Sequence, residues 1–168
     1  MLDIVIIGSG PAGLSAAIYG SRSGLDILVI EKISHGVGQI AEADCINNYL
    51  GFSSIRGFEL GMQFRTHAEA CGVRFQESEA IKLERTDACW KIYSKDGSCI
   101  QSKTVIYAAG ASHRHLNVFG EEALIGKGVS YCATCDGTFY KGKDVAVIGG
   151  GNTAVGDALY LSDLTKSI

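Results

Sequence analysis

Residues 4–13 read IVIIGSGPAG, a continuous apolar run that ends in the glycine pattern GxGxxG. An apolar run bounded by glycines is typical of a buried parallel strand, and the small and apolar residues 14–23 predict the helix that follows it. A second apolar run at 25–30 completes a βαβ unit of about 30 residues. This stretch therefore predicts an α/β fold with a parallel sheet.

The glycine pattern is formed by Gly8, Gly10 and Gly13, with Pro11 and Ala12 before the last glycine. Between a strand and a helix, such glycines allow a tight turn, close approach of a pyrophosphate to the backbone, and close helix–strand packing. The helix N-terminus adds free N–H groups and a partial positive charge. We expect a dinucleotide to bind here; the alternative is a glycine turn that binds nothing.

A carboxylate ends the second predicted strand, because Glu31 follows the apolar run and Lys32 follows Glu31. At this position of a dinucleotide-binding βαβ unit, an acidic side chain accepts hydrogen bonds from ribose hydroxyls. Glu31 and Lys32 are therefore candidate nucleotide-binding residues.

A second glycine loop, GGGNTA at 149–154, follows the apolar run 145–148 and precedes a predicted helix at 153–162. Alanine stands at the third glycine position, where it is often tolerated. The residues that choose between NADH and NADPH lie about 20 residues further on, beyond Ile168. We expect a second dinucleotide site; the alternative is a loop without a working site.

Two cysteines, Cys132 and Cys135, lie between the glycine loops in the sequence CATCD. Thiols at this spacing can close a small disulfide, and one of them can have a lowered pKa. The alternatives are two buried thiols or half of a zinc site, although His113 and His115 would be unusual further ligands, and we expect no metal. Asp136 is either a proton donor to a leaving thiolate or a turn residue. Two dinucleotide loops around a dithiol suggest electron transfer from one cofactor through another to a disulfide.

The composition limits the class of protein. The chain has 168 residues, 46% of them hydrophobic, and a net charge of −3, which is typical of one globular domain or one domain plus a fragment. Without a basic run we expect no nucleic-acid partner. No apolar run reaches the roughly 18 residues of a membrane span, and the N-terminus lacks a signal peptide's positive segment, so we expect a soluble, cytoplasmic protein. The other cysteines are expected to be buried in a reducing compartment, namely Cys45, Cys71, Cys89 and Cys99.

The rest of the chain predicts a mixed arrangement. Residues 34–58 are polar and poorly periodic, which favours a functional loop, and residues 113–131 read as a linker. Further elements are a helix at 58–70, alternating strands at 80–85 and 89–93, a hairpin turn at 95–98 and a buried strand at 104–109.

Three stretches now identify a resemblance: GSGPAGL at 8–14, GVSYCATCDG at 128–137 and VIGGGNTAV at 147–155. In sequence and order they strongly resemble the low-molecular-weight thioredoxin reductases, over essentially the whole chain. The resemblance implies an α/β fold with a three-layer, Rossmann-like FAD-binding domain (two β layers and one α layer) at 1–110. It also implies the beginning of a second Rossmann-like domain, for NAD(P), at 111–168, which carries the dithiol.

The resemblance implies an activity and partners as well. Noncovalent FAD would bind the first loop and NADPH the second; electrons would pass from NADPH through FAD to the Cys132–Cys135 disulfide, and the dithiol would reduce thioredoxin or a thioredoxin-like protein. Asp136 would be the acid, and the protein would be a homodimer. Cofactor contacts implied in the same way are Gly38, Gln39, Asn48, Ala109, Gly110, Gly149, Gly151, Asn152 and Thr153.

The chain also departs from that family. GVGQ at 36–39 carries an apparent insertion, and prolines expected near Leu50 and Phe119 are absent. The chain is about half a typical member, so we expect an N-terminal portion whose activity alone is in question. Two alternatives stay open: an FAD-dependent dithiol oxidoreductase that uses ferredoxin or oxygen, and a non-catalytic fragment that binds a nucleotide weakly.

Overall fold

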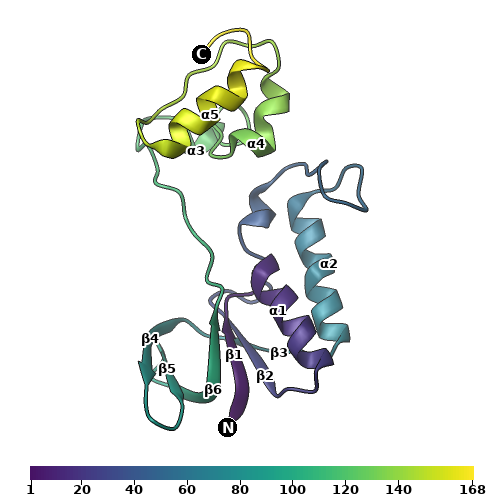
Figure 1. Ribbon diagram of the computed structural model, residues 1–168, viewed down its shortest axis with the longest axis vertical. Coiled ribbons are helices and arrows are strands. Elements are labelled where there is room, and N and C mark those ends of the chain that lie inside the picture. The colour runs from purple at the N-terminus through teal and green to yellow at the C-terminus, as the bar shows by residue number, and fades with distance from the viewer. The chain divides into compact units, whose positions relative to one another are not determined.

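The computed structural model describes residues 1–168, which form two compact units, Met1–Ser112 and His113–Ile168 (Figure 1). The sequence places a domain boundary at residue 110, and the contacts place the division just after it. No helix is both long enough and apolar enough to cross a membrane.

The first unit is built on a six-stranded mixed sheet in the order β3-β2-β1-β6-β5-β4. The ladders from β3 to β6 are parallel, and those joining β6, β5 and β4 are antiparallel. The strands are β1 (Leu2–Ile7), β2 (Ile27–Glu31), β3 (Arg74–Glu77), β4 (Ala80–Arg85), β5 (Trp90–Ser94) and β6 (Cys99–Tyr107).

Strand β6 belongs to both parts of the sheet. Its first residues pair with β5, and from Ser102 to Tyr107 it pairs with β1. The sequence predicts a separate strand only at 104–109, because polar residues interrupt the apolar run. The structure is continuous there, since Ser102 is fully buried and its hydroxyl donates to the carbonyl of Thr104 at 2.7 Å.

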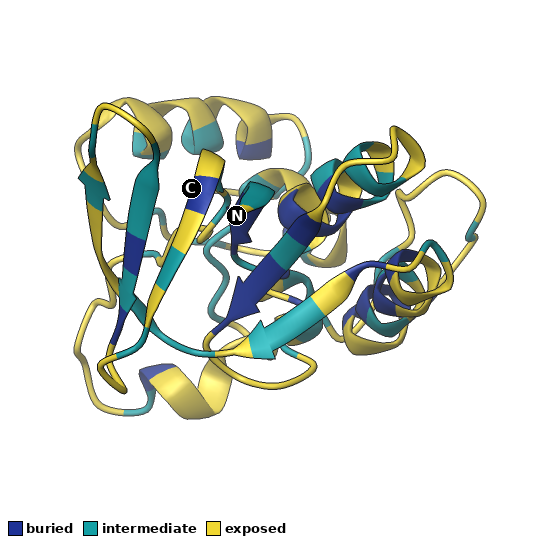
Figure 2. Ribbon diagram, turned by 90° about the horizontal axis from the view of Figure 1, so that it is seen from below, coloured by how far each residue is buried: buried dark blue, intermediate teal, exposed yellow.

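Two helices, α1 (Pro11–Arg22) and α2 (Gly57–Ala70), cover one face of the parallel strands. That face buries Ile6 and Val29 against α1 and α2. Because side chains alternate along a strand, Val5 and Ile7 point the other way and pack with Ile92 of β5. The antiparallel strands thus cover the second face, and the α/β class with its Rossmann-like layers is confirmed. Figure 2 shows buried residues concentrated on the strands next to the N-terminus.

Residues 34–58 are largely irregular, as predicted. They contain a short 3₁₀ helix, η1 (Gln39–Glu42), and one antiparallel bridge between Ile46 and Ile55. Val37 joins this segment to α2, because its side chain is buried and packs on Gly61.

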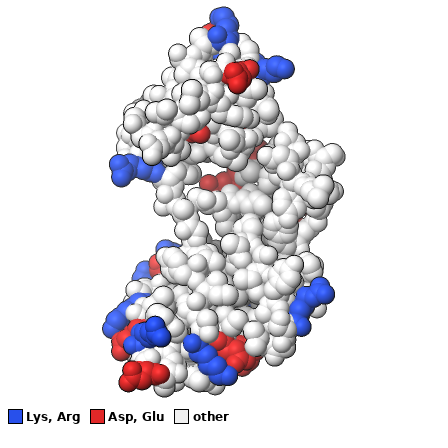
Figure 3. All heavy atoms as spheres, in the orientation of Figure 1, with Lys and Arg blue, Asp and Glu red and all other residues white.

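Figure 3 shows charged side chains of both signs interspersed over the lower part of the first unit, the part in which Figure 1 marks the N-terminus. Exposed ion pairs lie in this unit, among them Lys103 with Asp3 at 2.7 Å and Lys82 with Glu84 at 3.0 Å. Exposed pairs of this kind contribute little to stability.

The second unit contains short helices. They are α3 (Glu121–Leu124), α4 (Ala133–Asp136), the 3₁₀ helix η2 (Gly137–Tyr140) and α5 (Asn152–Ser162). The strand predicted at 145–148 is wrong: there is only an isolated parallel bridge between Asp144 and Ser167. A strand needs a neighbouring ladder, and here only two backbone hydrogen bonds join residues 143–145 to 166–167. Ile148 consequently stays 67% exposed.

Candidate nucleotide and dithiol sites

The first glycine loop joins β1 to α1, and its backbone leaves no room for side chains. Gly8 has a φ of 107°, and a Cβ there would come closer than 3.0 Å to the carbonyl of Ala108. A Cβ at Gly13 would meet the carbonyl of Gly8 equally closely. No side chain caps α1 at Gly10, and Pro11 opens the helix, so N–H groups of the first turn remain available to an anion.

Gly13→Ala is expected to destabilise the first unit by about 1–3 kcal/mol, because the methyl group would collide with backbone that cannot rotate away. The control is Gly10→Ala, whose Cβ would lie 3.7 Å from Cα of Gly38 in ordinary contact. Denaturant unfolding of both variants measures the effect. Equal stability of the two variants would show that the close approach at Gly13 is not what stabilises this turn.

Other candidate cofactor residues converge on the loop at the carboxyl ends of the parallel strands. A Cβ at Gly38 would lie 3.0 Å from Cα of Gly10. The side-chain amide of Gln39 donates from Nε2 to the carbonyl of Ala111. Ala109 follows β6 and borders Gly8. In open α/β sheets, ligands bind outside this edge. Gly110, with a φ of 73°, continues from Ala109, whereas Asn48 is exposed in the loop bridged by Ile46 and Ile55.

The carboxylate of Glu31 lies at the same edge and is only 3% exposed. Arg65 of α2 donates from Nη1 to both oxygens of Glu31, at 2.9 and 2.7 Å, and from Nε to Glu69 at 2.7 Å. Its guanidinium carbon lies 3.4 Å from the centre of the Phe75 ring. Burial acts to lower the pKa of Arg65, but the hydrogen bonds to Glu31 and Glu69 outweigh burial and raise it.

The sequence reasoning missed Arg65, although a signal was present. It occupies the same face of α2 as Leu60, Gly61 and Ala68, all of them buried. A cation in an apolar stripe has to be paired, because an isolated buried charge is costly. Lys32, next to Glu31, instead forms an exposed ion pair, in which Nζ lies 2.8 Å from Oε1 of Glu79. It also lines a shallow pocket of about 370 Å³.

The second glycine loop has the same backbone layout as the first. Gly149 has a φ of 136°, Gly151 precedes α5, and the N–H of Val155 donates to the carbonyl of Gly151 at 3.1 Å. In the first loop, the N–H of Leu14 donates to Gly10 at 3.0 Å. Asn152 and Thr153 begin α5, which again has no side-chain cap.

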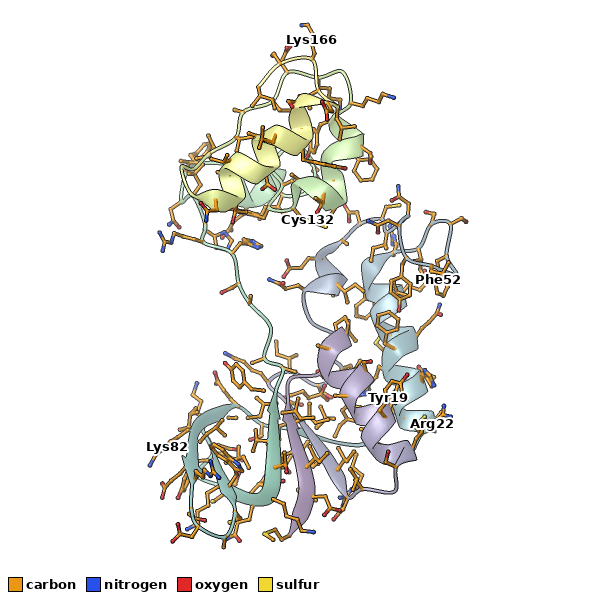
Figure 4. All side chains as sticks on the ribbon, in the orientation of Figure 1. Tyr19, Arg22, Phe52, Lys82, Cys132 and Lys166 are labelled. Carbon is orange, nitrogen blue, oxygen red and sulfur yellow. A yellow bond between two sulfur atoms is a disulfide. The ribbon has the colours of Figure 1, made fainter.

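A disulfide joins Cys132 and Cys135, whose Cα atoms are 5.3 Å apart. Cys135 is exposed, Cys132 is half-buried, and Figure 4 places Cys132 at the opposite end of the second unit from Lys166. The N–H of Cys135 donates to Sγ of Cys132 at 3.3 Å. Cys135 is therefore the more exposed of the two bonded residues, and exchange with an external thiol requires access to one of the two sulfurs.

Asp136 directly follows Cys135, and Ser130 lies two residues before Cys132. The hydroxyl of Ser130 donates to Oδ2 of Asp136 at 2.6 Å and accepts from the N–H of Cys132 at 3.1 Å. Sequence reasoning did not single out Ser130, and a serine two positions before a Cys-x-x-Cys was the available signal.

A buried carboxylate organises the chain before the dithiol. Glu121 is 4% exposed and accepts hydrogen bonds from the N–H of Leu116 at 2.9 Å, from the Tyr131 hydroxyl and from His115. The ring of His113 stacks on Tyr131 at 3.8 Å. His113 and His115 thus pack around Tyr131, and no group of three or more potential metal ligands occurs.

Stability of the second unit is expected to fall on acidification through Glu121. Burial raises the pKa of Glu121, but hydrogen bonds from three backbone N–H groups and His115 outweigh burial and lower it. A carboxylate with a lowered folded-state pKa stabilises the fold above its unfolded pKa, and that stability is lost as the pH falls through the folded value. Glu121→Gln should flatten the pH dependence of thermal unfolding, whereas exposed Glu122→Gln should not; identical profiles would refute this.

The remaining cysteines differ from expectation. Cys45 and Cys99 are exposed, and Cys71 and Cys89 are half-buried, so the prediction that all four are buried is wrong. Cys45 lies in the irregular segment away from either core cluster, and Cys99 is the first residue of β6 beside a hairpin.

The fold and these sites define an α/β protein with two dinucleotide-type glycine loops and a Cys-x-x-Cys disulfide. Comparison with known proteins narrows the class: the family described as pyridine nucleotide-disulphide oxidoreductase matches residues 2–168. The chain therefore belongs to the pyridine nucleotide-disulphide oxidoreductase family.

Its relatives within that family are chiefly thioredoxin reductases, which confirms the resemblance. The chain is 42% identical over 166 residues to the thioredoxin reductase of Mycoplasma genitalium, covering 99% of the chain and 52% of that protein. It is 43% identical over 170 residues to the "34.2 kDa protein in rubredoxin operon" of Clostridium pasteurianum, covering 99% of the chain and 54% of that protein. The crystal structure of thioredoxin reductase from Streptococcus pyogenes matches with a TM-score of 0.92 and 41% identity, over 99% of this chain and 54% of that one. The chain thus spans about half the length of these relatives.

Proposed function

We propose that the protein is a thioredoxin-disulfide reductase, which passes electrons from NADPH through FAD to the Cys132–Cys135 disulfide and on to thioredoxin or a thioredoxin-like protein. The observation that carries this proposal is a bonded Cys-x-x-Cys, accessible at Cys135, in the same chain as two glycine loops of dinucleotide type. By the same resemblance we propose a cytoplasmic homodimer.

The residues at the edge of the first sheet fit FAD. Gly8, Gly10 and Gly13 leave the backbone bare where a pyrophosphate would approach, and the uncapped N–H groups of α1 supply donors to it. The paired carboxylate of Glu31 keeps lone pairs that can accept from ribose hydroxyls. Flavin, when bound, supplies the exchange of two electrons between a hydride donor and a disulfide. We assign Gly38, Gln39, Ala109 and Gly110 to the walls of this site, with Lys32 and Asn48 at its margins.

The second loop is proposed to hold the nicotinamide nucleotide. Gly149 and Gly151 leave the same bare turn before α5, and Asn152 and Thr153 provide the first N–H groups of that helix. We therefore assign these four residues to the pyrophosphate of NADPH.

The dithiol region has the groups that a disulfide reduction needs. Opening the S–S bond takes up two electrons and leaves two sulfurs, one of which departs as a thiolate and requires a proton. Asp136 follows Cys135 directly, and its carboxyl group is held by Ser130 at 2.6 Å. We therefore assign Asp136 the role of the acid that protonates the departing sulfur.

Anaerobic addition of NADPH to the chain loaded with FAD tests the proposal. The flavin absorbance should bleach, and oxidised thioredoxin should then restore it. A flavin that NADPH leaves oxidised would contradict the proposed donor.

A second candidate is an FAD-dependent dithiol oxidoreductase that uses another donor or acceptor. Two observations favour testing it: residues 46–51 depart from the family pattern, and one relative is described by its place in a rubredoxin operon. Bleaching of the flavin by reduced ferredoxin but not by NADPH would support this candidate, and reoxidation by air alone would identify oxygen as the acceptor. Bound flavin without any disulfide turnover would leave a nucleotide-binding protein.

A further inference from the structure

The hydroxyl of Ser130 makes one contact on each side of the dithiol. It donates to Oδ2 of Asp136 at 2.6 Å and accepts from the N–H of Cys132 at 3.1 Å. A hydroxyl has one proton to donate and two lone pairs to accept with, so both contacts can exist together. The carbonyl of Cys132, at 3.3 Å, is a more distant acceptor for the same proton.

The hydrogen bond between Ser130 and Asp136 links the two ends of the segment that carries both cysteines, and this link does not depend on the S–S bond. Ser130 precedes Cys132 by two residues, and Asp136 directly follows Cys135. The backbone N–H of Asp136 also donates to the carbonyl of Cys132 at 3.0 Å. When the disulfide opens, the side-chain bridge between Ser130 and Asp136 still holds the ends of the CATC segment together.

We propose that Ser130 is a positioning residue that keeps the Cys132 and Cys135 thiols close together in the reduced protein and so favours closure of their disulfide. The inference rests on the proposed redox role of this dithiol. A thiol held beside its partner has a high effective concentration, whereas a looser loop loses that advantage in conformational entropy. The bridge is also well formed, because the hydroxyl oxygen of Ser130 lies only 2.6 Å from Oδ2 of Asp136.

Equilibration with glutathione tests the proposal on the chain itself. Two glutathione thiols reduce the Cys132–Cys135 disulfide, giving glutathione disulfide and the protein dithiol, with two electrons and two protons passing to the protein sulfurs. Alkylation followed by mass spectrometry of the peptide between Lys127 and Lys141 reports the reduced fraction of this pair alone.

Ser130→Ala should make the disulfide easier to reduce, shifting the equilibrium constant towards the dithiol by roughly five- to tenfold, as expected for the net loss of a typical hydrogen bond. Ser130→Thr keeps the hydroxyl and should stay close to the wild type. Ser162→Ala is the matched control, because that hydroxyl donates to the carbonyl of Leu159 away from the dithiol. In an Asp136→Ala background, Ser130→Ala should add no further shift.

Each other outcome counts against the proposal. An unchanged constant in Ser130→Ala overturns it, and so does an equal shift in Ser130→Thr or a full shift in the Asp136→Ala background. A wild-type chain whose Cys132 and Cys135 never form a disulfide in the glutathione buffer overturns the proposed function, and this inference with it.

Discussion

Cys132→Ser is expected to abolish disulfide turnover while flavin binding stays intact. A serine hydroxyl cannot form the S–S bond that Cys132 makes with Cys135, so no position remains to which two electrons can pass. The proposed FAD contacts of the first unit lie in Met1–Ser112, outside the substituted segment. Thioredoxin reduction and FAD titration of the same preparation measure the two properties separately.

The matched control is Cys99→Ser, which removes an exposed, unbonded thiol from the start of β6. It should retain both turnover and flavin binding, and Cys135→Ser should behave like Cys132→Ser. Loss of flavin from either dithiol variant would argue for a structural role of the disulfide. Residual turnover in Cys132→Ser would remove the pair from the electron path.

Arg65→Met is expected to cost about 3–5 kcal/mol in the free energy of unfolding, the largest effect on stability that we foresee. The substitution leaves Glu31 as a buried carboxylate without its cation and removes the guanidinium from the face of Phe75. Denaturant unfolding, followed by a probe of the first unit, measures the loss. A variant within about 1 kcal/mol of the wild type would show that the buried pair does not need its arginine.

Two further variants separate the buried pair from the exposed one. Glu69→Gln breaks only the contact of Arg65 with a carboxylate that is 46% exposed, and should cost less than about 1 kcal/mol. The double change Glu31→Met with Arg65→Met should recover most of the stability, because an apolar pair avoids the desolvation of both charges. It should nevertheless weaken FAD binding, since no carboxylate remains for the ribose. Tight FAD binding by the double variant would remove Glu31 from the proposed site.

Much of the first unit could be predicted because its signals are local. The apolar run before Gly8, the glycine spacing and the periodicity of residues 58–70 each determine structure within a few turns of chain. Strand β6 was predicted too short, because a sequence pattern does not reveal that a polar residue such as Ser102 finds a backbone partner inside the sheet.

The parts that could not be predicted depend on distant contacts. The pairing of Arg65 with Glu31 joins residues 34 positions apart, and only the packing of α2 on the sheet brings them together. The strand predicted at 145–148 had the right composition, but composition does not supply a neighbouring strand. In the dithiol segment, the spacing of Cys132 and Cys135 indicated the disulfide, whereas the role of Ser130 emerged only from the conformation of its loop.

We propose that the first unit binds FAD through the loop at Gly8–Gly13 and the carboxylate of Glu31. The most direct test is the visible absorbance spectrum of the purified chain, before and after incubation with FAD and removal of the free cofactor. We expect flavin bands that stay with the protein and that are weakened or lost in the double variant Glu31→Met with Arg65→Met, which leaves no unpaired buried charge. A folded chain that remains colourless after incubation with FAD would contradict it.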